Sequence, residues 1–379
     1  MQPIYFDYNA TTPLDRGVKE AMIPYLDTIF GNPSSVHQLG RDARVALDSA
    51  RERCARVLGS KASEVVFTSG GTESNNLAIF GVVRLLEGRG RHLITSPTEH
   101  HSVLHCFQYL ARNGFDVTYL NVDANGRVDP VQVAESIRKE TILVSVMAAN
   151  NETGMIQPVP EIGAICRQKG VLFHTDASQF FGKEPFASIC QFNADLVTVC
   201  AHKFHGPKGA GALFIKSPLL PHPLLFGGGH ENERRAGTEN LAAILGLTMA
   251  LEQFVRDPVF PAERLRKFAE QLREATESVP GTQVISSNKS GLANTLSFLV
   301  EGCDSIALMA GLDLEGVCAS SGSACSAGSL EPSHVVSAMG YPRHLANALV
   351  RFSLGRENTR TEVERVAELL PIVIKRLRN

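Results

Sequence analysis

The chain has 379 residues, of which 44% are hydrophobic and 20% charged, with 37 basic against 39 acidic side chains. This length exceeds what one hydrophobic core usually supports, so we expect two domains. The near-balanced charge gives no electrostatic argument for a nucleic-acid or membrane partner. The sequence has no apolar run long enough to span a bilayer and no basic-then-apolar leader, so we expect a cytoplasmic protein. The eight cysteines are scattered without a CxxC pair, which favours neither a disulfide framework nor a zinc site.

The first two thirds of the chain alternate short apolar runs with longer segments. We expect buried strands at residues 64–68, 92–96, 116–121, 141–150, 171–177, 195–200 and 211–216. Most of these runs are separated by enough residues for a helix. This alternation predicts a mostly parallel sheet with helices on both faces, so the fold class is α/β.

The pattern changes near residue 240. Residues 239–255 and 262–279 have helical periodicity, and 293–300 and 347–355 are strand-like. A last helix carries an apolar stripe, and Pro371 within it is expected to bend or shorten that helix. We therefore predict a large α/β domain at 14–255 and a smaller α+β domain formed by 1–13 and 256–379.

Polar segments follow five of the predicted strands: SGGTESNN, SPTEHHS, NETG, DASQ and AHKFHGPKG. Ligands of open α/β sheets bind at the carboxyl ends of the strands, so these segments are expected to form one site. The glycine pair before Thr72 and Glu73 resembles a helix start with free N–H groups, which favours a phosphate. A plain glycine turn with a threonine N-cap is the alternative.

Two charged residues stand out at these strand ends. Asp176 follows a strand and should be buried, where a carboxylate requires a cation or several donors; an ordinary salt-bridge or capping aspartate is the alternative. Lys203 lies at a strand end with little scope to reach solvent, so we expect a lowered pKa and a nucleophilic amine. Lys208, in the following turn, is expected to be a solvated surface charge. Such a lysine and aspartate, with a histidine and a phosphate-type helix start, together indicate pyridoxal 5'-phosphate.

Two further features remain open at this point. His101 and His105 have the spacing of a helical metal pair, but no third ligand or HExxH motif accompanies them. Cys325 lies in SSGSACSAGSLEPS, residues 320–333, among small polar residues that predict a surface loop. Such a cysteine is either an accessible, reactive thiol or a plain surface residue.

The motifs DYNATTPLD, FGNPSSVHQLGR, VFTSGGTESNNLAI, TEHHSVL, NNETG, HTDASQ, CAHKFHGPKG, RRAGTEN, SGSACSAGSLEPSHV and RFSLGR together resemble cysteine desulfurases of the NifS and IscS type. They extend over residues 7–356, nearly the whole chain. The resemblance implies a fold type I pyridoxal-phosphate enzyme that works as a homodimer with active sites at the subunit interface.

The resemblance also implies roles for individual residues. Lys203 would bind the cofactor covalently, Asp176 would pair with its ring nitrogen, and His100 would stack on the ring and exchange protons near the substrate sulfur. The remaining cofactor contacts would come from Asn151, Gln179, Gly71, Thr72, His202 and, from the partner subunit, Thr238. Cys200 stands where the IscS branch has a serine, so a phosphate hydroxyl is missing; a strand-end core cysteine is the other interpretation.

Substrate contacts are implied in the same way. Arg351 would grip the α-carboxylate, although a lone arginine on a strand can also serve a structural ion pair. Asn32 and His37 would line the site.

The implied reaction converts L-cysteine to L-alanine through aldimine and ketimine intermediates on the cofactor. The Lys203 amine would remove the Cα proton, and Cys325 would take the sulfur as a persulfide for delivery to an acceptor such as an iron-sulfur scaffold. Alternatives are a serine-pyruvate aminotransferase or selenocysteine lyase of the same fold, a silent sulfur carrier, and a zinc hydrolase.

Overall fold

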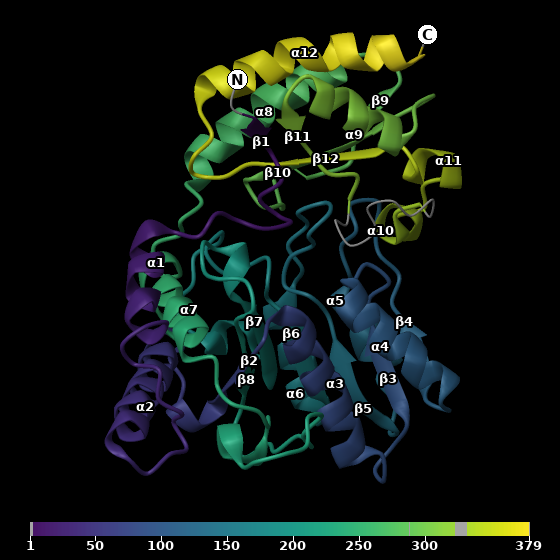
Figure 1. Cartoon of the computed structure of the whole chain (residues 1–379). Helices are drawn as coiled ribbons and strands as arrows, with labels where there is room; N and C mark the ends of the chain where they lie inside the picture. The colour runs from purple at the N-terminus through teal and green to yellow at the C-terminus, as the bar shows by residue number, and fades with distance from the viewer. Residues whose placement is uncertain (1–2, 288, 323–331, 379) are drawn as a thin grey trace.

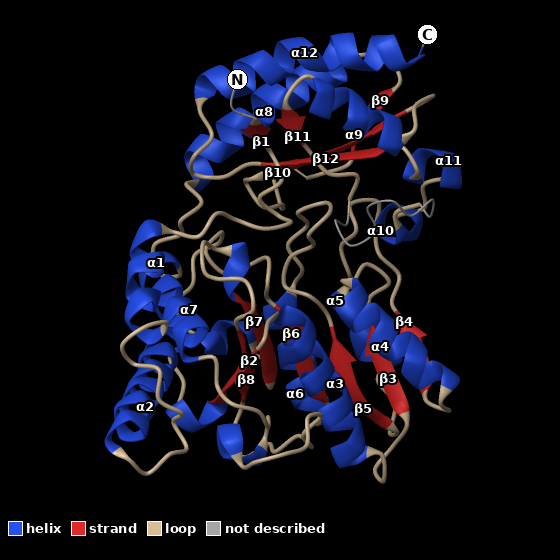
Figure 2. Cartoon of the chain, viewed as in Figure 1, coloured by secondary structure: helices blue, strands red, loops and turns tan. Residues whose placement is uncertain are grey.

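The computed structural model describes residues 3–287, 289–322 and 332–378. Figure 1 shows a larger part built around one broad sheet and a smaller part that contains the C-terminal helix. Figure 2 shows the strands of the broad sheet between helices. Among the described helices, none combines the length and hydrophobicity that crossing a bilayer requires.

The large sheet has seven strands in the order β2-β8-β7-β6-β5-β3-β4. β8 is antiparallel to both of its neighbours, and the other pairs are parallel, so the predicted mostly parallel sheet is confirmed. The strands are β2 (Val65–Thr68), β3 (His92–Thr95), β4 (Asp116–Tyr119), β5 (Thr141–Ser145), β6 (Leu172–Asp176), β7 (Leu196–Cys200) and β8 (Gly211–Ile215).

Helices cover both faces of this sheet, as expected for a sheet whose strands are apolar on both sides. Alternate residues of one strand enter different cores: Val66 packs in the cluster that contains α3 and α4, whereas Val65 and Phe67 pack with α2, α6 and α7. The helices of this part are α1 (Arg16–Met22), α2 (Gln38–Leu58), α3 (Gly71–Leu86), α4 (His101–Arg112), α5 (Pro130–Ser136), α6 (Val159–Lys169) and α7 (Leu241–Phe254). Short 3-10 helices are η1 (Ile23–Tyr25), η2 (Ala62–Glu64), η3 (Ile189–Phe192), η4 (Ala201–Lys203) and η5 (His230–Glu233).

The smaller part has two small sheets, one with the order β12-β10-β9 and one that pairs β1 with β11. Its strands are β1 (Ile4–Tyr5), β9 (Thr282–Val284), β10 (Thr295–Val300), β11 (Val317–Cys318) and β12 (Leu349–Ser353). The helices are α8 (Ala262–Glu277), α9 (Ser305–Leu314), α10 (His334–Ala338), α11 (Arg343–Ala346) and α12 (Arg360–Arg378). The predicted apolar stripes pack inward, with Leu265, Leu272, Val363, Val366, Leu370 and Val373 almost fully buried.

One expectation about a single element is wrong, and one of the two alternatives given for Pro371 is excluded. β4 was expected to be buried, but it is the edge strand of the large sheet, and its residues are exposed or half-buried. Pro371 does not shorten the last helix, because α12 continues to Arg378. The apolar residues on both sides of Pro371, Leu370 and Val373, are buried, so packing against the core outweighs the hydrogen bond that proline removes.

The N-terminal segment lies between the two parts. Asn9 N donates to Ser353 Oγ of β12 at 2.9 Å, while Thr12 N donates to the carbonyl oxygen of His202, beyond β7, at 3.0 Å. Residues 7–12 therefore contact both parts where the large sheet ends. The proposed domain limits, 14–255 against 1–13 with 256–379, stay a prediction.

Candidate active site

One cavity of about 400 Å³ opens at the carboxyl ends of the large sheet. Its walls come from the segments that follow β2, β3, β5, β6 and β7, together with the N-terminal segment and β12. The predicted convergence of five strand ends is therefore confirmed. The predicted site residues in its lining are Gly71, Thr72, His100, Asn151, Asp176, Gln179, Cys200, His202, Lys203 and Arg351.

Asp176 is the last residue of β6 and is 5% exposed. One carboxylate oxygen accepts from Asn75 Nδ2 at 2.7 Å, and the other accepts from the backbone N–H of Ser178 at 2.9 Å. The predicted burial is confirmed, and hydrogen-bond donors accompany the carboxylate as required. Because Asp176 faces the cavity, it can accept a further hydrogen bond from a protonated ring nitrogen.

Lys203 ends the short helix η4, directly after β7. Its Nζ donates to the carbonyl oxygens of Asn9 at 2.8 Å and Ala10 at 2.9 Å. These backbone acceptors hold the side chain of Lys203 in the cavity lining. The expected lowering of the Lys203 pKa stays a prediction. Lys208 is exposed, as expected, and lies at the cavity rim.

His100 is the N-cap of α4 and lies in the cavity wall. Its Nδ1 accepts from the backbone N–H of Ser102 at 3.1 Å and lies 2.7 Å from Ser102 Oγ. Since Nδ1 is an acceptor, the neutral ring carries its proton on Nε2. Burial lowers the pKa of His100, so this neutral form is favoured.

The start of α3 forms the phosphate-type end of the cavity. The N-cap is Gly70, without a side-chain cap hydrogen bond, so the alternative of a threonine N-cap is wrong. At Gly71 a Cβ would come within 3.0 Å of Ser178 Oγ and 3.4 Å of Cys200 Cβ. Glycine therefore lets the helix start pack closely against Ser178 and Cys200, at an end of the cavity where helix N–H groups favour an anion.

The two other residues at this end are His202 and Cys200. His202 Nδ1 lies 3.0 Å from Thr11 Oγ1, and burial lowers the pKa of His202 to about 4. Cys200 is buried, and its burial raises the thiol pKa, so it offers an uncharged thiol where a hydroxyl would donate more strongly.

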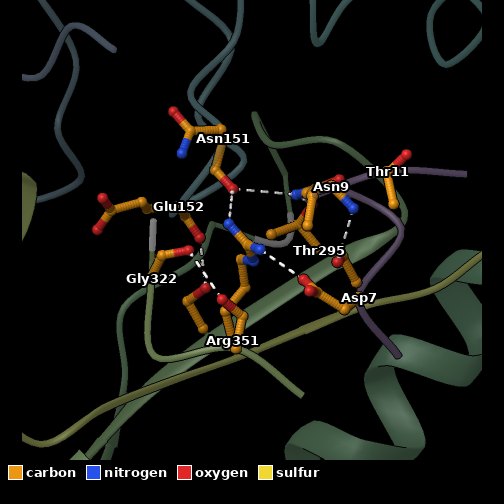
Figure 3. Close-up of polar contacts among 12 residues, drawn as sticks. Asp7, Asn9, Thr11, Asn151, Glu152, Thr295, Gly322 and Arg351 are labelled. Atoms are coloured by element: carbon orange, nitrogen blue, oxygen red, sulfur yellow. Dashed lines mark hydrogen bonds and ion pairs between the residues drawn. The ribbon is translucent and has the colours of Figure 1, made fainter. Parts of the chain in front are cut away.

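Arg351 on β12 is 1% exposed and completes the cavity from the smaller part. Its Nη2 lies 2.6 Å from Asp7 Oδ1, and its Nη1 donates to the carbonyl oxygen of Asn151 at 2.9 Å, as Figure 3 shows. Nε has no partner among the described residues. Arg351 thus forms a structural ion pair and also lines the cavity, and its grip on a substrate carboxylate stays a prediction.

This set of groups fits pyridoxal 5'-phosphate. A buried carboxylate, a lysine amine, a neutral imidazole and a helix start without a side-chain cap line the same cavity. Those are the partners that the ring nitrogen, the aldehyde carbon, the ring face and the phosphate require.

Comparison with known proteins agrees with this geometry. The aminotransferase class-V family model matches residues 4–366. A cysteine desulfurase IscS from Dictyoglomus turgidum is 44% identical over 99% of this chain and 95% of its own length. This chain is a cysteine desulfurase-family member of aminotransferase class V. The predicted family is thereby confirmed.

Solved structures place the fold in the same family. A protein described as NifS-like superposes with a TM-score of 0.92 at 36% identity and covers 99% of this chain and 100% of that one. SspA in complex with cysteine superposes with a TM-score of 0.83 at 36% identity, over 94% of this chain and 100% of that one. The predicted fold type I architecture of the pyridoxal-phosphate enzymes is therefore confirmed.

Cys325, the thiol expected to accept sulfur in this desulfurase family, lies outside the described residues. Its described flanks both approach Glu152, which is 2% exposed. Ser333 Oγ donates to Glu152 Oε2 at 2.5 Å, and a Cβ on Gly322 would come within 2.9 Å of the same oxygen. Ser320 exchanges two backbone hydrogen bonds with Arg351, at 2.7 and 3.2 Å. The chain therefore enters and leaves the segment of Cys325 beside the cavity.

Three predicted site residues do not line the main cavity of their own chain. Thr238 lies in a second cavity of about 190 Å³. Asn32 is exposed, and its Oδ1 accepts from Ser34 N at 2.9 Å. His37 caps α2 by accepting from Gly40 N at 3.3 Å. Roles for these residues in a desulfurase site stay predictions, and the one for Thr238 places it in the partner subunit's site.

The sequence reasoning missed Asn9 and Asn75, which line the cavity, and Asp7 and Lys183, which hydrogen-bond to lining residues from outside it. Asn9 holds Lys203 through its carbonyl oxygen, and Asn75 holds Asp176. Asp7 and Asn9 belong to the DYNATT motif, whose early place in the chain gave no indication that it returns to the sheet ends. Lys183 follows Gln179 by four residues, and that spacing was the available indication that the two side chains contact each other.

The pair His101 and His105 lies on α4, with ring centroids 4.7 Å apart. The His334 ring lies 4.6 Å from His101. Burial lowers the pKa of His101 to about 4. Within the described residues no group of three or more His, Cys, Asp or Glu residues is arranged to hold a metal ion.

Proposed function

We propose that this chain is a pyridoxal-phosphate-dependent cysteine desulfurase that converts L-cysteine to L-alanine and passes the sulfur to Cys325. The observation that carries the proposal is the single cavity that Lys203, Asp176, His100 and Arg351 share. Relatives named as cysteine desulfurases match nearly the whole chain, which supports the same reaction.

The bound cofactor would withdraw electrons from the substrate and so weaken its Cα–H and Cβ–S bonds. Asp176 would keep the ring nitrogen protonated, which this electron withdrawal requires. Gly71 and Thr72 would offer backbone N–H groups to the phosphate, with His202 beside them.

The substrate would be held by its carboxylate and deprotonated by Lys203. Arg351 offers a planar guanidinium whose Nε is unpartnered among the described residues, which suits a carboxylate. The Lys203 amine donates to two backbone carbonyls, so in its neutral form the nitrogen lone pair stays available for the Cα proton. His100, with its proton on Nε2, would donate to or accept from the leaving sulfur.

Cys325 would complete the reaction as a thiolate. Its sulfur attacks the substrate sulfur, so an S–S bond forms while the Cβ–S bond breaks. The electron pair of the broken bond stays on Cβ, which takes up a proton and becomes the methyl group of alanine. The position of the Gly322 and Ser333 flanks beside the cavity supports this role.

The protein would work as a homodimer in the cytoplasm and deliver its persulfide to an acceptor protein such as an iron-sulfur scaffold. Apolar side chains exposed in the segment between α1 and α2, among them Leu26, Phe30 and Val36, support burial against a second copy. An aminotransferase would share the cofactor residues but has no need of a thiol at position 325, and selenocysteine would be an additional substrate. A silent sulfur carrier has no need of the lysine, aspartate and arginine in the cavity.

The proposal is tested with Cys325→Ser. We expect this variant to lose alanine and sulfide formation almost completely, because a hydroxyl cannot accept sulfur as a persulfide. It should keep the visible absorption of the bound cofactor, since Lys203 and Asp176 are unchanged. Alanine formation and absorption spectra of purified protein measure the two effects.

Cys318→Ser is the matched control, because Cys318 is a partly exposed thiol on β11. It should retain the parent rate. A Cys325→Ser variant that forms alanine and sulfide at the parent rate refutes the role of Cys325. A parent protein without cofactor absorption refutes the enzyme proposal as a whole.

A further inference from the structure

Lys183 is a buried lysine beside the cavity that the reaction itself does not use. Its side chain is 3% exposed, although lysine is almost never fully buried without a charged partner. Nζ donates to Asn9 Oδ1 at 2.7 Å and to Gln179 Oε1, and it lies 5.3 Å from the centre of the Phe260 ring. No described carboxylate forms an ion pair with it. A buried amine is costly unless its N–H groups are hydrogen-bonded, so the two neutral acceptors are the compensation that the structure provides.

The two contacts decide which way two amide groups point. An amide oxygen that accepts from Lys183 forces the amide nitrogen to the opposite side. For Gln179, that side is the carbonyl oxygen of Asn9, which accepts from Gln179 Nε2 at 2.9 Å. The same carbonyl oxygen accepts from Lys203 Nζ at 2.8 Å. Lys183, Gln179, Asn9 and Lys203 therefore form one connected set of hydrogen bonds.

Asn9 and Gln179 depend on Lys183 to different degrees. The Asn9 side chain is also held by Asn294 Nδ2 at 3.1 Å and by Thr295 Oγ1 at 2.9 Å. Gln179 lines the cavity and has a second Nε2 hydrogen that its bond to Asn9 does not use. Loss of Lys183 should therefore disturb the orientation of Gln179 more than that of Asn9.

We propose that Lys183 is a positioning residue of the active site. It orients Gln179 so that one amide N–H faces the Asn9 carbonyl oxygen, which also holds Lys203, and the other faces the cofactor cavity. The inference rests on the proposed function. It adds a residue that touches neither cofactor nor substrate and acts through Gln179.

The surroundings of Lys183 agree with a neutral amine in this role. Burial lowers the pKa of Lys183 well below its usual value; Lys203 and Arg351 lower it further, while Glu184 raises it. A neutral amine has two N–H groups, which match the oxygens of Asn9 and Gln179. Lys183 can thus position the amides without adding a charge to the site.

Lys183→Met tests the proposal, because methionine fills a similar volume without an N–H donor. We expect cofactor affinity to fall about tenfold, since a buried amide oxygen loses its donor and the amide reorients. The pH midpoint of the bound cofactor's absorption should also shift. Both are measured by equilibrium titration of the apoprotein with pyridoxal phosphate and by spectra across pH. Lys183→Gln keeps an N–H donor and should restore most of the affinity.

A double-mutant cycle with Gln179→Leu separates positioning from general stability. In the Gln179→Leu background, Lys183→Met should have little further effect on affinity or on the pH midpoint. Arg273→Met, which removes a mostly buried arginine of α8, should lower the melting temperature alone. The inference is overturned if Lys183→Met lowers the melting temperature without changing the spectrum, or if Lys183→Gln loses as much affinity as Lys183→Met. It is also overturned if the double variant loses cofactor affinity by the product of the losses in Lys183→Met and Gln179→Leu. A parent without cofactor absorption refutes the proposed function instead.

Discussion

Individual side chains of the cavity are held by neutral donors and acceptors rather than by opposite charges. Asp176 accepts from an amide and a backbone N–H, and Lys203 donates to two carbonyl oxygens. Arg351 is the exception, because Asp7 lies 2.6 Å from its guanidinium. Asp176 and Lys203 are therefore fixed by neutral partners, and their charges stay available for an ionic interaction with a ligand.

Arg351→Lys tests the substrate-binding role at this scale. Lysine keeps the positive charge near Asp7 but cannot form two parallel hydrogen bonds with a carboxylate. We expect KM for cysteine to rise about tenfold or more, the cost of a lost charged hydrogen bond, with a smaller change in kcat. Steady-state kinetics measure both quantities.

Arg273→Lys is the control, since Arg273 bonds the carbonyl oxygen of Ser286 outside the cavity. An Arg351→Lys variant with the parent KM would show that Arg351 serves the Asp7 ion pair alone.

At the scale of elements, the large sheet places polar groups within its interior as well as at its ends. His174 on β6 is fully buried between hydroxyl groups, with Nδ1 2.8 Å from Ser145 Oγ and Nε2 3.2 Å from Thr198 Oγ1. Burial lowers the pKa of His174 to about 4 from the usual 6.5. The central strands therefore contain a histidine that must stay neutral while the protein is folded.

This histidine predicts acid sensitivity. In the unfolded chain His174 binds a proton below about pH 6.5, whereas in the folded protein it binds one only below about pH 4. The free energy of unfolding therefore falls as pH falls through this window. One such histidine contributes about 2 kcal/mol of loss between about pH 7 and about pH 5. Urea unfolding at the two pH values measures the loss.

His174→Gln removes this titration. Between about pH 7 and about pH 5 the variant should therefore lose about 2 kcal/mol less of its free energy of unfolding than the parent does. The comparison uses the slope of the free energy of unfolding against pH, because a general destabilisation by the substitution changes the absolute value but not this slope. Equal slopes for parent and variant would contradict the assignment.

At the scale of the whole molecule, the cavity forms where the two parts and the N-terminal segment meet. The large part carries cofactor-type residues, and the smaller part carries Arg351 and the flanks of Cys325. Thr238 and Asn32 remain outside this cavity. A second copy of the chain is the partner that the exposed apolar surface between α1 and α2 predicts.

Val36→Asp tests this dimer, because Val36 is 89% exposed within that surface. A charge there should shift the protein from dimer to monomer, as measured by sedimentation velocity, and lower turnover if the partner completes the site. Ile372→Asp is the matched control, since Ile372 is 61% exposed on α12 and should leave the dimer intact. A monomeric parent, or a Val36→Asp variant that stays dimeric, contradicts the prediction.

Much of this protein was determined by its sequence. The strand runs, the polar residues after them and the glycine pair before Thr72 predicted the sheet, the edge that carries the site, and Asp176 and Lys203 within it. These predictions succeed because hydrophobic periodicity and strand direction are local properties of the chain. The family motifs added His100 and Arg351, and they gave Cys325, already noted in its polar loop, the role of sulfur acceptor.

Other features were decided by the tertiary structure alone. Burial of Leu370 and Val373 keeps α12 helical across Pro371, and the strand order leaves β4 at an edge. Asp7 and Asn9 meet Arg351 and Lys203 across more than half of the sequence, and Lys183 becomes a buried donor only when Asn9 returns to the sheet ends. Local patterns cannot encode such contacts, because each depends on where distant segments pack and which buried polar atoms they leave to be satisfied.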